Sequence, residues 1–186
     1  MENMNEQSKR KSNEEQLYKV FYNVNDWLKF AEAKNAMLIA FNGASIFGVT
    51  QLYDLKYVKD SEGIKGYLFF VIVCLVFSTV NCLISFAPRV KIIKGGLYSS
   101  GKIANVLFFE YLKGKSNLEI VQEITGDNEK EKYTTLEKDI AEQIKQNSII
   151  SSRKYSHFTI SVWITISAYV TILLAGIFAL YTYLKD

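Results

Sequence analysis

Three long windows without charged side chains dominate this sequence of 186 residues. They cover residues 35–53, 66–88 and 155–184, which are 19, 23 and 30 residues without Asp, Glu, Lys or Arg. A helix of roughly 20 apolar residues spans a bilayer core of ~30 Å, so the second and third windows are long enough and the first is marginal. The sequence therefore predicts an all-α membrane protein with three transmembrane helices and excludes a simple soluble domain.

The polar stretches between these windows divide the rest of the chain. Residues 1–34 are expected to form a cytoplasmic tail and an amphipathic helix, 54–65 an external connector, and 89–154 a helical cytoplasmic region. The amphipathic helix is predicted because Ser12 and Glu15 have the spacing of a capping box and apolar residues follow at intervals of three and four. These apolar residues are Leu17, Val20, Phe21, Val24, Trp27, Leu28 and Ala31.

Helical periodicity continues through residues 89–154. Short helices are expected over 103–112 and from Ser116 or Asn117 to about Thr125. No Gly or Pro occurs between about Asn128 and Gly176, so one long helix is expected to run unbroken into the third window. Its predicted buried seam consists of Tyr133, Leu136, Ile140, Ile144 and Asn147.

Basic residues near the windows predict the orientation of the chain. Residues 89–109 contain four basic and no acidic residues, and residues 143–154 contain three basic and no acidic residues. The connector contains three basic and three acidic residues. Cytoplasmic loops carry an excess of Lys and Arg. The amino terminus and the 89–154 region are therefore expected in the cytoplasm, and the connector outside.

Small and polar residues inside the windows predict contacts between helices. A stripe of small side chains at four-residue spacing lets another helix approach closely, which favours a homo-oligomer. This small-residue stripe is Ala36, Ala40, Ala44 and Gly48. Polar side chains in hydrocarbon either line a wet path or form hydrogen bonds between helices, and both interpretations explain them equally well. The polar candidates are Asn42, Asn81, Thr165, Ser167 and Thr171.

Catalytic and metal-binding chemistry has little support in the sequence. The single histidine, His157, and the two cysteines of the second window do not make a zinc site or a nucleophile–base pair. We expect Cys74 and Cys82 to be packing residues and His157 to be an interface anchor rather than a proton switch. No enzyme activity, metal or cofactor is predicted. The net charge of +3 is too small to favour a nucleic acid polymer as partner.

One motif resembles a nucleotide-binding loop and is rejected. Residues 96–102 fit G-x-x-x-x-G-K, but Ile103 replaces the Ser or Thr that would hold magnesium. A phosphate loop also follows a buried strand, whereas residues 89–94 are a basic stretch after a membrane helix. A basic turn near lipid headgroups is the preferred interpretation, and phosphate binding without hydrolysis remains the alternative.

Several segments resemble the transmembrane effectors of Pycsar bacterial antiphage systems. The resemblance begins at Asn25–Ala36 with Leu38–Ala44, and continues in Phe86–Pro88, Phe108–Leu112 and Asp139–Tyr155. It implies an effector that lies in the bacterial inner membrane, responds to a cyclic nucleotide from a partner cyclase and impairs the membrane during infection. The family provides no ligand motif that can be carried over to positions of this chain.

Candidate ligand-binding residues therefore come from geometry alone. A cyclic nucleotide needs a cationic donor and a stacking surface, and three basic or aromatic clusters are expected at the inner membrane surface. They contain Trp27 and Lys34; Arg89, Lys91, Lys94 and Tyr98; and Arg153 and Lys154. Orientation signals alone would also explain the basic residues. The leading prediction is an effector that forms oligomers or pores, and the alternative is a non-gated scaffold whose cytoplasmic helices bind a protein partner.

Overall fold

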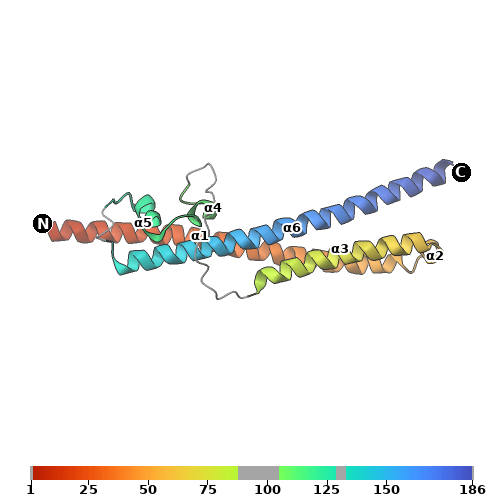
Figure 1. Cartoon of the computed structure of the whole chain (residues 1–186), viewed down its shortest axis with the longest axis horizontal. Helices are drawn as coiled ribbons and strands as arrows, with labels where there is room; N and C mark the ends of the chain where they lie inside the picture. The colour runs from red at the N-terminus through yellow and green to blue at the C-terminus, as the bar shows by residue number, and fades with distance from the viewer. Residues whose placement is uncertain (1, 88–104, 129–132, 186) are drawn as a thin grey trace. The chain divides into compact units, whose positions relative to one another are not determined.

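The computed structural model describes residues 2–87, 105–128 and 133–185, and all regular structure in these ranges is α-helical. This confirms the predicted fold class. The helices, labelled in Figure 1, are α1 (Glu2–Leu52), α2 (Lys56–Lys59), α3 (Glu62–Phe86), α4 (Phe109–Leu112), α5 (Asn117–Thr125) and α6 (Thr135–Lys185).

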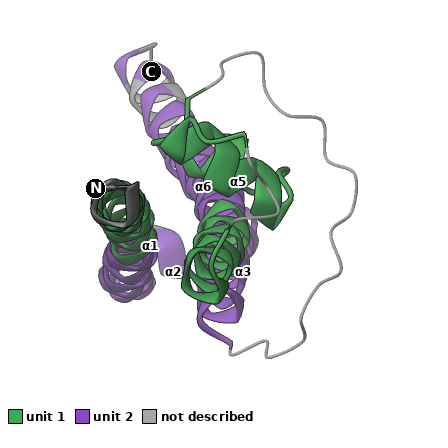
Figure 2. Ribbon diagram, turned by 90° about the vertical axis from the view of Figure 1, so that its left-hand side faces the viewer, with its two compact units in different colours: residues 1–31, 88–154 green, residues 32–87, 155–186 purple. Residues whose placement is uncertain are grey.

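The chain forms two compact units, which Figure 2 shows in different colours. Unit 1 consists of residues 1–31 and 88–154, and unit 2 consists of residues 32–87 and 155–186. The long helices α1 and α6 contribute residues to both. Each unit therefore combines segments that are far apart in the sequence.

Unit 1 has an apolar core contributed by four helices and by Tyr133. Leu17, Val20 and Val24 of α1 are buried there, which confirms the predicted amphipathic face. The other core residues are Leu112, Ile120, Val121, Tyr133, Ile140, Ala141 and Ile144. The prediction that Leu136 lies in this seam was wrong, because its side chain is 43% exposed while the neighbouring Glu137 is only 2% exposed.

Local signals explain where α5 begins and ends. Ser116 and Glu119 form the reciprocal capping box of α5, and Gly126 follows with φ of 70°, a left-handed conformation that glycine adopts without strain. The predicted start and end of α5 are thus confirmed. The predicted start at Ser12 was wrong, since α1 already begins at Glu2, and α4 is shorter than the helix expected over 103–112.

Helix α6 runs without a break from Thr135 to Lys185, which confirms the predicted continuous helix. Thr134 caps it, because the Thr134 hydroxyl accepts from the backbone N–H of Glu137 at 3.1 Å and the Glu137 carboxylate accepts from the N–H of Thr134 at 2.7 Å. Glu137 is therefore needed at the helix start, which explains why a carboxylate occupies a buried position.

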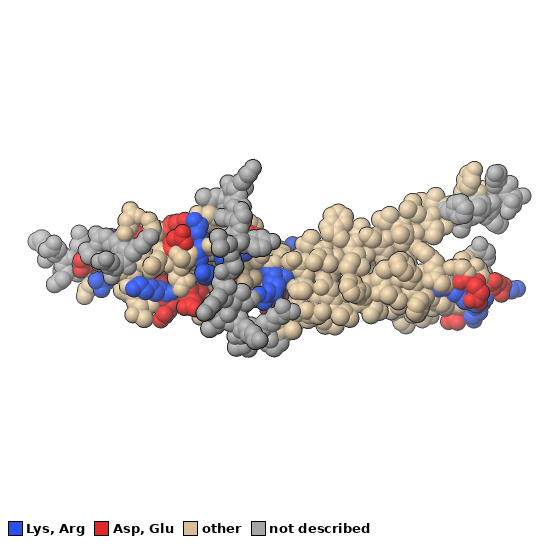
Figure 3. Space-filling view, viewed as in Figure 1, with Lys and Arg blue, Asp and Glu red and all other residues tan. Residues whose placement is uncertain are grey.

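Unit 2 packs α1, α2, α3 and α6 around a small apolar core of Val49, Val58, Leu68, Val71, Leu75 and Ala168. Large apolar side chains such as Phe47, Phe69 and Trp163 are more than 60% exposed on its surface. In Figure 3 a long stretch of this unit carries neither basic nor acidic side chains, and both kinds gather at the end with α2. Such an apolar exterior is typical of helices that face lipid.

Two described helices, rather than the three that we expected, contain segments apolar enough to span a bilayer. These segments are Glu62–Ile84 and Thr135–Ile177. The first predicted window lies in α1, which does not qualify. The reason is that Asn35, Asn42 and Gln51, together with the small residues of the stripe, lower the apolarity of this part of α1.

Candidate functional site

Three buried polar side chains from three different helices meet inside unit 2. Asn42 of α1 and Ser78 of α3 are fully buried, and Thr165 of α6 is 4% exposed. The Asn42 amide nitrogen lies 2.9 Å from the Ser78 hydroxyl, which lies 2.9 Å from the Thr165 hydroxyl. The Thr165 hydroxyl in turn lies 3.0 Å from the Asn42 carbonyl oxygen. We call these three residues the polar ring.

The donors of the polar ring follow from the chemistry of its members. An amide nitrogen only donates, so Asn42 donates to Ser78, and an amide oxygen only accepts, so Thr165 donates to Asn42. The Ser78 hydroxyl then donates either to Thr165 or to the backbone carbonyl of Ser161, also at 2.9 Å. Each of the three side chains thus has a hydrogen-bond partner on both of the other helices, which matters because an unpaired polar side chain in an apolar interior is costly.

A second hydrogen-bonded group adjoins the ring through Ser161, whose hydroxyl donates to the Ser78 carbonyl at 3.0 Å. The Asn81 amide nitrogen donates to the Ser161 hydroxyl at 2.9 Å and to the His157 carbonyl at 3.1 Å. Both amide hydrogens are used, so the Asn81 carbonyl oxygen faces Nδ1 of His157 at 2.9 Å and Nδ1 carries a hydrogen. Protonation at Nε2 leaves this bond intact, which favours an anchor rather than a switch.

The small-residue stripe lies on the exposed surface of α1. Ala36, Ala40, Ala44 and Gly48 are all exposed, and a Cβ added at Gly48 would meet nothing within 4 Å. The opposite side of the helix, with Asn35, Asn42 and Val49, is the buried side. The contacts of α1 within unit 2 therefore do not use the stripe.

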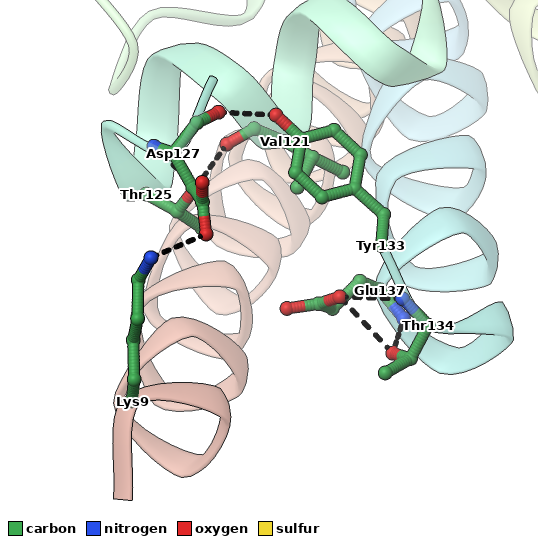
Figure 4. Close-up of polar contacts among 7 residues, drawn as sticks. All are labelled: Lys9, Val121, Thr125, Asp127, Tyr133, Thr134 and Glu137. Carbon is green, nitrogen blue, oxygen red and sulfur yellow. Dashed lines mark hydrogen bonds and ion pairs between the residues drawn. The ribbon is translucent and has the colours of Figure 1, made fainter. Parts of the chain in front are cut away.

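A polar cluster, which we call the distal cluster, lies in unit 1 between α1, the end of α5 and the start of α6 (Figure 4). The ammonium group of Lys9 forms a 2.9 Å ion pair with Asp127, and the Tyr133 hydroxyl donates to the backbone carbonyl of Asp127. Burial raises the pKa of Tyr133, and the charges of Asp127 and Glu137 raise it further against the opposing effect of Lys9. The Tyr133 hydroxyl is therefore harder to deprotonate than that of an exposed tyrosine.

Comparison with known proteins identifies the family. The family model described as PycTM, the Pycsar effector protein domain, matches residues 16–181. The chain belongs to this family. No curated protein and no solved structure matches the sequence. Membership makes the chain an antiphage transmembrane effector, and it confirms the resemblance found in the sequence.

In this Pycsar effector, three of the five predicted polar candidates come together. Asn42 and Thr165 belong to the polar ring, and Asn81 belongs to the adjoining group. Ser167 and Thr171 are exposed and donate to backbone carbonyls of their own helix, at Trp163 and Ala168. A wet path along these residues stays a prediction.

The structure does not bring the predicted ligand-binding residues together in one described site: some lie outside the described residues, and the others are divided between unit 1 and unit 2. Arg89, Lys91, Lys94 and Tyr98 lie outside the described residues, as does the rejected loop motif. In unit 1, Trp27 packs against Phe108 and Phe109 with ring centroids 6.1 and 5.7 Å away, and Lys154 is only 9% exposed, next to the partly buried Arg153. In unit 2, the Lys34 ammonium lies 5.4 Å from the centroid of the Tyr155 ring and 5.5 Å from that of Phe158.

Sequence reasoning missed Ser78 and Ser161 as members of the hydrogen-bonded network of this Pycsar effector. Ser78 precedes Asn81 by three residues, and Ser161 lies four residues after His157 and four before Thr165. These spacings place each set on one helical face. That periodicity of polar residues within apolar windows was the available signal.

Proposed function

We propose that this Pycsar effector responds to a cyclic nucleotide and impairs the integrity of the bacterial inner membrane by forming an oligomer or a pore. The observation that carries the proposal is the polar ring, because polar side chains are expensive to place in the apolar interior of a bundle that spans a membrane. Polar residues inside membrane-spanning segments often line the pathways of ions and substrates. In the described arrangement, the three side chains of the polar ring form hydrogen bonds to one another instead.

The polar ring supports a resting state in which the helices are closed. Asn42, Ser78 and Thr165 bond one another and are buried between the helices, so they offer no open route to water or ions. Separation of α1, α3 and α6 would expose all three residues toward the space between the helices. A nucleotide signal that favours the separated state over the closed one would thereby create a polar route.

Chain topology supports a position for α1 inside the bilayer even though it is not apolar enough to span alone. Residues 1–31 and 88–154 form one compact unit, which we place on the cytoplasmic side because of its basic residues. A chain that leaves and returns to one side crosses the bilayer an even number of times. Since α3 crosses once, residues 32–61 must cross as well, and the ring hydrogen bonds of Asn42 reduce the cost.

Assembly in the proposal uses the small-residue stripe. Its members are exposed on α1, and a Cβ added at Gly48 would meet nothing within 4 Å, so they are available to a second copy of the chain. Small residues permit close backbone approach in lipid, where packing rather than hydrophobicity drives helix association. A homo-oligomer built on this face would place several polar rings around a common axis or weaken the bilayer locally.

The experiment that tests the proposal is ion leakage from liposomes containing the purified full chain. A panel of cyclic mononucleotides and cyclic dinucleotides is added, with the linear nucleoside monophosphates as matched controls. We expect leakage with at least one cyclic nucleotide and none with its linear counterpart. Leakage that is equal with and without nucleotide contradicts the gated mechanism, and no leakage under any condition favours the scaffold alternative.

A further inference from the structure

The distal cluster of unit 1 surrounds a cavity of about 210 Å³. Three elements line the cavity: α1, the residues that follow α5, and the start of α6 with Tyr133 just before it. The lining residues are Glu6, Lys9, Arg10, Asn13, Asp127, Tyr133 and Glu137, so the cavity carries three carboxylates and two cations. Its residues belong neither to the polar ring nor to the small-residue stripe.

Two buried polar groups at this cavity retain unused hydrogen-bonding capacity. Asn13 is only 6% exposed, and its side chain makes no hydrogen bond to any residue that the structure describes. Glu137 is 2% exposed, and both hydrogen bonds to its carboxylate from Thr134 end on the same oxygen, Oε2. In Figure 4 the other oxygen points away from Thr134 toward α1. Both groups line the cavity and are therefore available to a ligand in it.

Cations lie on the exposed side of the same cavity. Lys9 is engaged by Asp127 in the 2.9 Å ion pair, whereas the exposed Arg10 forms no ion pair with a described residue. An arginine guanidinium binds a phosphate through two parallel hydrogen bonds. The cavity thus combines a buried carboxylate oxygen, a buried amide and an available phosphate donor.

Size and charge limit the ligand. A cavity of about 210 Å³ is below the ~300–1,000 Å³ that accommodate drug-sized ligands, so it holds one base and not a dinucleotide. A larger cavity of about 420 Å³ in unit 1 is lined by Tyr18, Phe21, Asp139 and Glu142, with no cation among its described lining residues, and would repel a phosphate.

We propose that the distal cavity binds a mononucleotide with its base inward and its phosphate at Arg10. The exocyclic amino group of the base donates to Oε1 of Glu137, the Asn13 amide pairs with the base edge, and the Tyr133 ring forms a wall. A carboxylate accepts from an amino group but repels the carbonyl oxygens that flank the N–H of uracil, so cytosine, adenine or guanine is preferred. The proposal that this mononucleotide is the cyclic signal rests on the proposed function.

Four lining residues of α1, Glu6, Lys9, Arg10 and Asn13, precede residue 16, where the match to the family begins. The other three lining residues, Asp127, Tyr133 and Glu137, lie inside the matched range. The cavity differs from the cluster of basic residues predicted near the membrane, and one binding experiment separates the two.

The test is calorimetric titration of the full chain in neutral detergent with 3′,5′-cyclic CMP, UMP, AMP and GMP. We expect cyclic CMP to bind more tightly than cyclic UMP, and Arg10→Gln and Asn13→Leu each to weaken binding about tenfold or more. Glu137→Gln keeps a capping side chain and should reduce the preference for CMP over UMP, a ratio that does not depend on the folded fraction. Lys19→Gln, on the exposed surface of α1, is the matched control with unchanged affinity, and Arg153→Gln tests the rival site near the membrane.

Wild-type affinity in Arg10→Gln and Asn13→Leu overturns the site, as does failure of all four nucleotides to bind the wild-type chain. Loss of affinity in Arg153→Gln with none in Arg10→Gln moves the site to the membrane-proximal residues and also overturns it. The liposome leakage assay distinguishes failure of the cavity as a binding site from failure of the proposed function. If nucleotide-gated leakage persists unchanged in Asn13→Leu, the cavity is excluded as the sensor while the effector function stands.

Discussion

The Thr165 hydroxyl donates a 3.0 Å hydrogen bond to the side-chain carbonyl of Asn42, although the two residues are 123 positions apart in the sequence. Ser78 bonds to both and closes the polar ring between α1, α3 and α6. A helix advances about 1.5 Å per residue, so a slip of one residue in any of the three helices breaks the ring. The ring therefore fixes the axial register of unit 2.

Replacement of Asn42 by Leu should lower the stability of unit 2. Hydrogen bonds between membrane helices contribute about 0.6 kcal/mol on average and up to about 1.7 kcal/mol, and Asn42 makes two. We expect a loss of about 1–2 kcal/mol, measured by denaturant unfolding in detergent. Ser167→Ala is the matched control, because Ser167 bonds only within its own helix and should change stability by less than about 0.5 kcal/mol. Equal effects of both substitutions would contradict a structural role for the ring.

Enlargement of the small-residue stripe should prevent assembly without affecting insertion. Ala40 and Ala44 are exposed, so Leu at either position leaves the packing of unit 2 unchanged but blocks close approach of a second helix. We expect cross-linking and growth arrest to weaken together for Ala40→Leu and Ala44→Leu. Val73→Leu, at a position on α3 that is 46% exposed, is the control that should retain both. Normal assembly and killing by the Ala→Leu variants would exclude the stripe as the assembly face.

Removal of a core side chain from unit 1 should separate folding of this unit from membrane insertion. Leu112 is fully buried in the core of unit 1, and Leu→Ala at such a site costs about 2–5 kcal/mol. We expect Leu112→Ala to remain in the membrane fraction while limited proteolysis of residues 105–128 becomes faster. Leu118→Ala, at a position 38% exposed, should behave like the wild type. Protease resistance of Leu112→Ala equal to that of Leu118→Ala would argue against this core.

Local sequence signals predicted much of the fold. The spacing of Leu17, Val20 and Val24 predicted the buried face of α1, and Ser116 with Glu119 predicted the start of α5. These features depend on residues within one or two turns of a helix. Ser12 misled because the residues before it, among them Gln7, Lys9 and Arg10, are good helix formers and extend α1 toward its amino terminus.

The candidate sites were less predictable because their members meet only after folding. The sequence singled out Asn42 and Thr165 as polar residues in apolar surroundings, but their pairing with Ser78 depends on the register of three helices. The distal cluster joins α1 to residues more than 110 positions later, and none of its members stands out by composition. Leu136 was placed in the buried seam because periodicity alone does not reveal that Glu137 is required for capping.

Alkaline pH should destabilise unit 1 through Tyr133. Burial and the nearby carboxylates raise the pKa of this phenol in the folded state above its ordinary value of about 10. The unfolded chain therefore loses the proton first. The contribution of protonated Tyr133 to the stability of unit 1 is present below about pH 10, and it is lost as the pH rises through the folded-state pKa.

Comparison of wild type with Tyr133→Phe isolates this contribution from the other tyrosines. At pH 8 the substitution removes the hydrogen bond to the Asp127 carbonyl and should cost about 1 kcal/mol. Between pH 9 and 11 the free energy of unfolding should fall less steeply for Tyr133→Phe than for the wild type, so that the difference between them shrinks. Equilibrium unfolding between about pH 9 and 11 measures this difference in the free energy of unfolding. Parallel pH profiles of the two proteins would mean that the pKa of Tyr133 is the same in the folded and unfolded chains.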